Sequence, residues 1–280
     1  MKKVLVTGAG GYIGRYVVTE LLNLGMDVIA CDIKTDSIDK RAKIVTLDIF
    51  DTENIFKKLN KPDICLHMAW REGFVHNSDI HMLQLSQHYL FINNMISQGL
   101  THLAIMGTMH EIGYHVGEIN DNTPCNPQSL YGIAKDALRK STAILCQEKK
   151  INFQWLRAFY IIGDDLQSNS VFSKILNASL SGKKIFPFNS GENKYDFIQV
   201  KDLAYLLSIS IIQDQINGII NCCTGKPVSL KNKVNEFIKE KGLSIQLDYG
   251  SYPDRVYDSP EIWGNPDKIN KIINIVNKRE

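Results

Sequence analysis

No stretch of the sequence reaches the roughly 18 consecutive apolar residues that a membrane-spanning helix needs. The chain also has almost no net charge, because 32 basic and 30 acidic residues are mixed along it and leave +2, so nothing indicates a nucleic-acid or membrane partner. The six cysteines form no C-x-x-C pair, which argues against a disulfide framework. The apolar start of the chain is too short for a signal peptide. We therefore expect a cytoplasmic protein with reduced thiols.

A chain of 280 residues, 44% of them hydrophobic, can bury a large core. Short apolar runs alternate along it with segments of helical periodicity, which predicts an α/β fold with a parallel sheet covered on both faces. The runs that we interpret as buried strands are 3–7, 27–31, 43–47, 64–68, 102–106 and 153–158. Later in the chain we expect further strands near 196–200 and 218–222.

A glycine-rich turn follows the first predicted strand. Gly8, Gly11 and Gly14 are spaced as G-x-x-G-x-x-G, with Tyr12 and Ile13 between them, and a helical segment begins directly afterwards. Such a turn lets the backbone approach a pyrophosphate and places the anion at a helix N-terminus. A merely tight loop is the alternative. The strand–turn–helix context favours dinucleotide binding.

A carboxylate follows the second predicted strand. Asp32 is placed to accept the adenosine ribose hydroxyls, and it would repel a 2′-phosphate, so NAD is expected. Lys34 and Arg41 nearby keep NADP open. Asp48 and Ile49, after the third strand, either contact the adenine or form an ordinary solvated strand end.

Tyr131 and Lys135 form a Y-x-x-x-K pattern at the start of a helical segment. Residues four apart share one helix face, so the ammonium can lower the pKa of the phenol and also hold the nicotinamide ribose. Thr108, at the end of the strand predicted over 102–106, is placed to bind the same substrate oxygen. The three residues together predict proton transfer to or from a carbinol oxygen.

With these motifs the chain resembles the extended short-chain dehydrogenase/reductase family of nucleotide-sugar epimerases, dehydratases and reductases over nearly its whole length. The resemblance rests on the glycine-rich turn, Leu66–Ala69, Thr108, the Tyr131/Lys135 pair, Leu156–Gly163 and Asp196–Asp202. Met68 and Ala69 match its H-x-A segment and are expected at the cofactor.

The resemblance implies a doubly wound Rossmann domain over 1–165 and a smaller, interleaved nucleotide-sugar domain over 166–280. The strands near 196–200 and 218–222 are expected to associate with the Rossmann domain. The resemblance also implies a homodimer built on two helices of each subunit.

The chain departs from the family at the turn after Thr108. The 4,6-dehydratases carry Asp and Glu there, whereas this chain has Met109 and His110, which makes dehydration doubtful. His110 stands where reductases that also epimerise carry an acid/base residue. With an ordinary pKa of about 6.5 it would suit proton exchange, and the alternative is that it only hydrogen-bonds.

The substrate contacts also differ. Tyr160 replaces the family's usual Asn, and Tyr195 replaces an Arg. Arg255 matches a late Arg that grips the substrate diphosphate, and the alternative is a solvated surface arginine.

The loop after 64–68 is rich in aromatic and polar residues. Trp70 and His76 are expected to shape the sugar pocket, because ligands bind at the carboxyl ends of parallel strands. His81 and His88 follow, but their spacing does not match a zinc site, so no metal is expected.

These features favour NAD(P)-dependent reduction at C4 of a nucleotide-activated 4-keto-6-deoxy sugar in bacterial surface polysaccharide synthesis. A nucleotide-sugar 4-epimerase or 4-oxidase with tightly held NAD is the first alternative. A noncatalytic NAD-sensing regulator is a distant one, since such proteins lose the Tyr or the Lys, and both are present here.

Overall fold

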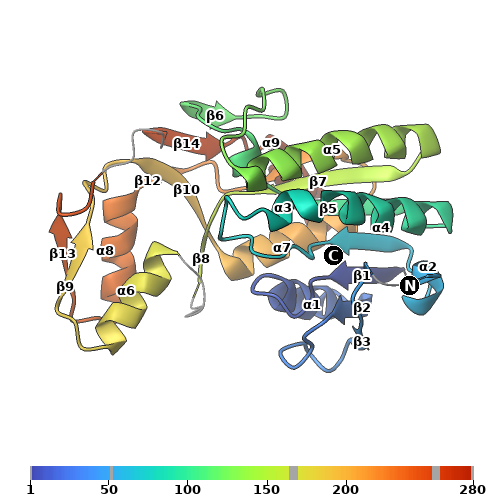
Figure 1. Cartoon of the computed structure of the whole chain (residues 1–280), viewed down its shortest axis with the longest axis horizontal. Coiled ribbons are helices and arrows are strands. Elements are labelled where there is room, and N and C mark those ends of the chain that lie inside the picture. The colour runs from blue at the N-terminus through green and yellow to red at the C-terminus, as the bar shows by residue number, and fades with distance from the viewer. Residues whose placement is uncertain (1, 51–52, 164–169, 254–258, 279–280) are drawn as a thin grey trace.

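The computed structural model describes residues 2–50, 53–163, 170–253 and 259–278 (Figure 1). Its main sheet has seven parallel strands in the order β11-β7-β5-β4-β1-β2-β3. This confirms the predicted doubly wound Rossmann sheet and its six N-terminal strands. The strands are β1 (Lys3–Thr7), β2 (Asp27–Asp32), β3 (Lys43–Thr46), β4 (Ile64–His67), β5 (His102–Thr108), β7 (Asn152–Ala158) and β11 (Gly218–Cys222).

Helices cover both faces of this sheet, and each face has its own apolar core. Side chains alternate between faces along a strand, so Val4 and Val6 of β1 join one core while Leu5 joins the other. The first core is closed by α1 (Gly14–Asn23), α7 (Val200–Ile211) and α9 (Asp267–Asn277). The second is closed by α2 (Ile55–Lys58), α4 (Leu85–Ser97) and α5 (Leu130–Lys149).

A smaller lobe lies at the left of Figure 1, around a third core. Its helices are α6 (Val171–Leu180) and α8 (Leu230–Glu240), beside a two-stranded sheet of β9 (Ile185–Phe188) and β13 (Gln246–Tyr249). A five-stranded sheet connects this lobe to the main body. It contains β6 (Gly117–Ile119), β8 (Tyr160–Ile162), β10 (Lys194–Gln199), β12 (Pro227–Ser229) and β14 (Glu261–Gly264).

The two late strands form, but in different sheets. β11 joins the main sheet beside β7. β10, expected with the Rossmann domain, instead pairs with β8, β12 and β14 of the connecting sheet, although its Ile198 packs into the first main-sheet core. One strand thus serves both parts of the molecule. Within the described residues, no helix is both long enough and apolar enough to span a membrane.

Asp196, on β10, connects the main sheet to the connecting sheet. Its side chain is fully buried. One carboxylate oxygen accepts hydrogen bonds from the backbone N–H (2.9 Å) and hydroxyl (2.6 Å) of Thr224, just after β11. The other accepts from the backbone N–H groups of Gly225 (2.8 Å) and Gly264 (3.2 Å). A single carboxylate therefore fixes segments from the main sheet and the connecting sheet.

We expect Asp196→Asn to lower the free energy of unfolding by about 3 kcal/mol, because an amide NH₂ would face buried N–H donors. Urea denaturation measures the change. The exposed Asp214, replaced by Asn, is the control and should change stability by less than about 0.5 kcal/mol. Equal stability of the two variants would contradict the role of Asp196.

Candidate active site

A cleft of about 1320 Å³ opens at the carboxyl ends of the main-sheet strands, facing the smaller lobe. The structure brings nearly every predicted site residue to its walls. The predicted residues that line it are Gly8, Gly11, Tyr12, Ile13, Gly14, Asp32, Asp48, Ile49, Met68, Ala69, Trp70, His76, Thr108, His110, Tyr131, Lys135 and Tyr160. Arg255 lies outside the described residues, so the structure does not test its role.

The first and last glycines of the glycine-rich turn have no room for a side chain. Gly8 has a φ of +69°, and a Cβ on it would lie 2.7 Å from the backbone nitrogen of Ala69. A Cβ on Gly14 would collide with the carbonyl oxygen of Gly8. The bare backbone thus opens onto the cleft at the start of α1, as a pyrophosphate cradle requires. The turn fits a dinucleotide.

Asp32 is held firmly at the end of β2. Its carboxylate accepts from the backbone N–H groups of Gly10 (2.9 Å), Ile33 (2.7 Å) and Lys34 (3.2 Å). The contact with Gly10, which the sequence pattern did not single out, ties the carboxylate to the phosphate turn. This is the arrangement that ribose recognition needs.

The predicted adenine residues lie further along the same edge. Asp48 accepts from the backbone N–H of Phe50 at 3.0 Å and pairs with Arg71 at 3.0 Å, and both side chains of the pair are partly exposed. Ile49 is buried and lines the cleft. Adenine contact by these two residues stays a prediction.

Tyr131 lies in the first turn of α5, which begins after Ser129, whose hydroxyl accepts from the backbone N–H of Gly132 at 3.2 Å. The backbone N–H of Tyr131 donates to the carbonyl of His76 at 2.9 Å. The predicted lowering of the phenol's pKa by Lys135 was wrong: burial raises that pKa to about 12, and a hydrogen bond with Thr108 acts in the opposite direction. At neutral pH the group is a protonated phenol and can donate a proton.

Lys135, one turn later, is only 3% exposed. Its Nζ donates to the carbonyl of Met106 at 2.9 Å and lies 3.9 Å from the centroid of the Trp70 ring. Burial lowers the pKa of the ammonium to about 7, and the charge of Glu111 opposes that shift. The indole supports the cation by a cation–π contact where water cannot.

Trp70 is in turn fixed by two histidines. Its ring stacks on His88 with centroids 4.3 Å apart and an interplanar angle of 11°, and its Nε1–H donates to Nδ1 of His81 at 3.0 Å. The other nitrogen of His81 lies 2.9 Å from the carbonyl of Val75 and therefore carries the proton. Trp70, predicted as a substrate residue, thus also supports Lys135.

A second imidazole chain lies behind this stack. The hydroxyl of Thr7 accepts from the backbone N–H groups of Met68 (3.1 Å) and Ala69 (3.2 Å), so it donates to Nδ1 of His67 at 2.8 Å. Nε2 of His67 then donates to Nδ1 of His88 at 2.9 Å. Burial lowers the pKa of both imidazoles, that of His67 to about 3, so both are neutral. Sequence spacing gave no signal for this chain.

His76 and His110 lie beside the phenol. His76 stacks on Tyr131 with centroids 5.4 Å apart, and the rings of the two histidines are 4.3 Å apart. The backbone N–H of His110 donates to the hydroxyl of Thr108 at 3.2 Å. Burial, reinforced by His76, lowers the pKa of His110 to about 3. A neutral imidazole favours the hydrogen-bonding role for His110 over that of a proton donor.

The wall toward the smaller lobe is aromatic. Tyr160 and Tyr195, at the positions of the family's Asn and Arg, stack with centroids 4.1 Å apart. Phe172, Phe186 and Phe188, which the sequence analysis did not single out, line the same side. Within the described residues, no group of three or more His, Cys, Asp or Glu side chains is arranged to hold a metal ion.

Comparison with known proteins agrees with this geometry. Residues 4–223 match the model of the NAD dependent epimerase/dehydratase family. The chain belongs to this family. It is therefore an NAD-dependent enzyme of the short-chain dehydrogenase/reductase type, and both the predicted family and the predicted cofactor are confirmed.

Among curated proteins, the dTDP-6-deoxy-L-talose 4-dehydrogenase (NAD(+)) of Aggregatibacter actinomycetemcomitans is 43% identical over 93% of this chain and 98% of its own length. The UDP-glucose 4-epimerase of Lactobacillus helveticus is 26% identical over 95% of this chain and 87% of its own. Among solved structures, the UDP-N-acetylglucosamine 4-epimerase of Methanobrevibacter ruminantium M1 superposes with a TM-score of 0.85, at 20% identity over 97% of this chain and 91% of that one. The last likeness supports the fold alone.

The buried ammonium makes a prediction about stability. The folded-state pKa of Lys135, about 7, lies below its ordinary value of 10.5. Burying the charge therefore opposes folding fully below pH 7, and the cost falls by about 1.4 kcal/mol per pH unit between pH 7 and 10.5. We expect Lys135→Met, without cofactor, to be more stable than wild type at pH 6, with an advantage that shrinks toward pH 9.

Urea denaturation of both proteins from pH 6 to pH 9 measures this difference. Lys149→Met, which replaces an exposed lysine of the same helix, is the control and should differ from wild type by the same small amount at every pH. An advantage of Lys135→Met that does not change with pH would contradict the electrostatic account.

Proposed function

We propose that this enzyme carries out NAD(H)-dependent oxidoreduction at C4 of a nucleotide-activated 6-deoxyhexose, with reduction of the 4-keto sugar as the productive direction. The supporting observation is the protonated Tyr131 phenol beside the buried ammonium of Lys135. The 43% identical relative named as a 4-dehydrogenase of a dTDP-6-deoxy sugar supports the same carbon and sugar class, and we propose dTDP as the nucleotide. The cytoplasmic location stays a prediction, consistent with six free thiols.

The chain's own groups have distinct parts in this proposal. Tyr131 donates a proton to the C4 oxygen, and the hydroxyl of Thr108 orients that oxygen. The ammonium of Lys135 stabilises the phenolate that remains, because opposite charges interact strongly in a buried site. His110 supplies a neutral imidazole and His76 a second imidazole that hydrogen-bond the sugar. When bound, the reduced cofactor supplies the hydride.

The cofactor contacts follow from the walls of the cleft. The turn of Gly8, Gly11 and Gly14 would hold the pyrophosphate, and Asp32 the adenosine ribose. Lys135 would hold the nicotinamide ribose. The fixed carboxylate of Asp32 favours NAD over NADP because it would repel a 2′-phosphate.

We expect Tyr131→Phe to reduce turnover about 10²- to 10⁴-fold and to leave NADH binding unchanged, because only the proton donor is lost. Absorbance of the reduced cofactor follows turnover with 4-keto-6-deoxy sugars of dTDP, GDP, CDP and UDP. The control is Tyr249→Phe, at an exposed position of β13. More than half of the wild-type rate in Tyr131→Phe would remove the phenol from the mechanism. If wild type oxidises no NADH with any of these sugars, the result would favour the epimerase or oxidase alternative.

The predicted homodimer also remains a proposal, and exposed apolar side chains support it. Leu90 of α4 is 55% exposed and Ile144 of α5 is 59% exposed, on two of the three helices that close one face of the sheet. Apolar groups exposed on adjacent helices are typical of an interface.

We expect the double variant Leu90→Glu/Ile144→Glu to be a monomer, because burying two carboxylates in an apolar contact is costly. Sedimentation velocity compares its mass with that of wild type. Leu180→Glu, on the exposed face of α6, is the control and should keep the wild-type mass. A monomeric wild type would contradict the proposal.

A further inference from the structure

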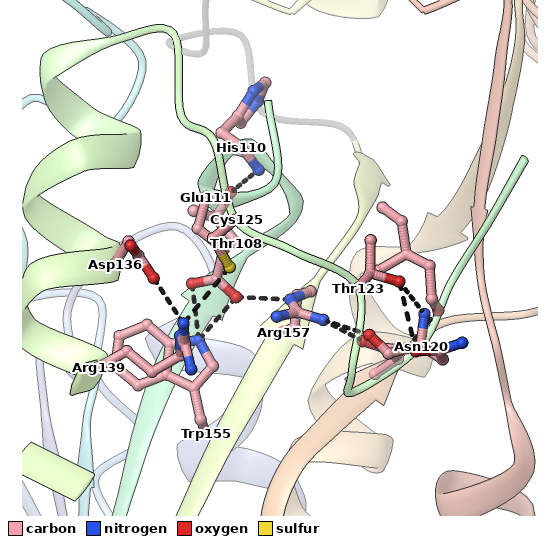
Figure 2. A network of polar contacts seen from close by, with 12 residues as sticks. Thr108, His110, Glu111, Asn120, Thr123, Cys125, Asp136, Arg139, Trp155 and Arg157 are labelled. Carbon is pink, nitrogen blue, oxygen red and sulfur yellow. Dashed lines mark hydrogen bonds and ion pairs between the residues drawn. The ribbon is translucent and has the colours of Figure 1, made fainter. Parts of the chain in front are cut away.

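Glu111 is a fully buried carboxylate at the end of the one-turn helix η1 (Met109–Glu111), which begins directly after Thr108. Both of its oxygens lie near Nε1 of Trp155, at 2.9 and 3.1 Å. One of them also pairs with Nε of Arg157 at 2.5 Å. Figure 2 shows the carboxylate between these two side chains of β7. A buried charge this well satisfied is tied to one position.

The cation of this pair is anchored as well. Arg157 is fully buried, and its Nη1 donates to the carbonyl of Asn120 at 3.3 Å and to the side-chain oxygen of Asn221 at 3.2 Å. Asn221 belongs to β11. The ion pair therefore connects the turn after β5 to two further strands of the main sheet.

Trp155 holds the other end of the same segment. A Cβ on Gly107, directly before Thr108, would lie 2.6 Å from Cε2 of the indole, so only glycine fits there. The indole thus packs against Gly107, which precedes Thr108, and hydrogen-bonds Glu111, which follows His110. At the start of α5, a Cβ on Gly132 would lie 2.5 Å from the carbonyl oxygen of His110. The turn is therefore seated against the helix that carries Tyr131.

Glu111, Trp155 and Arg157 are absent from the cleft walls formed by the described residues. Apart from the charge of Glu111, which raises the pKa values of Lys135 and Tyr131, they can therefore influence the reaction only through the groups that they hold. Thr108 is the first such group, because its hydroxyl shares a hydrogen bond with Tyr131 and accepts the N–H of His110.

We propose that Glu111, Trp155 and Arg157 are positioning residues that fix the turn after β5 so that the hydroxyl of Thr108 faces Tyr131 during C4 chemistry. The inference rests on the proposed function. Displacement of a catalytic group by about 1 Å can lower the rate 10²-fold, so a rigid turn helps to keep the rate high. The plain alternative is that the network only stabilises the core.

A double-mutant cycle separates the two roles. Trp155→Phe keeps an aromatic ring at this buried position and removes the N–H that binds Glu111 together with part of the indole, so thermal melts must accompany the kinetics. We expect it to lower kcat at least tenfold in the wild-type background and less than threefold in a Thr108→Val background. The KM for NADH should change less than twofold in both, because the phosphate turn follows β1, away from the turn after β5.

A parallel cycle uses Arg157→Lys, which keeps the buried cation and removes the Nε contact with Glu111. We again expect a drop in kcat that is much smaller in the Thr108→Val background. Trp263→Phe, on β14 and outside the residues of the cleft wall, is the matched control and should keep wild-type kcat. Thermal melts record the stability of every variant.

An equal loss of kcat with and without the Thr108 hydroxyl, or no loss at all, would overturn the inference. Loss of thermal stability alone, with kcat unchanged, would show a structural role only. A wild-type enzyme that is inactive with every nucleotide sugar would instead contradict the proposed function, and this inference with it. An active wild type in which the effects of Trp155→Phe and Thr108→Val on kcat are additive would contradict only the positioning role.

Discussion

The ammonium of Lys135 is buried against the indole of Trp70 and bound by one backbone carbonyl. Removing such a charge from water is costly, and burial accordingly lowers its pKa to about 7. In the proposed mechanism the same ammonium stabilises the charge that Tyr131 acquires when it gives up its proton. Much of the neighbouring architecture serves to keep these two groups in place.

Neutral histidines form most of that support. His88 stacks on Trp70, and His81 accepts its N–H, so the indole cannot turn away from Lys135. His67 links this stack to the backbone that follows β4. Because burial lowers the pKa of His67 and of His88, these two imidazoles add rigidity without adding positive charge beside the ammonium. The histidine cluster here holds Trp70 against Lys135.

Much of this site could be predicted from the sequence, because its motifs are local. Gly8 to Gly14 lie in one turn, and Tyr131 and Lys135 share one helix face, so spacing alone determines which groups meet. The contacts of Trp155 with Glu111 and of His67 with His88 join distant segments, and no local period reports them. For the same reason the pairing of β10 with the connecting sheet was missed, since a short apolar run does not reveal its neighbours.

In our proposal, this site moves a hydride to C4 of a nucleotide-activated 6-deoxyhexose while Tyr131 supplies the proton. The most direct measurement uses NADH deuterated at the transferred position, a dTDP-4-keto-6-deoxy sugar and NMR of the released product. We expect one deuterium at C4 for each NADH oxidised. A product without deuterium at C4, or a sugar epimerised with no net oxidation of NADH, would contradict it.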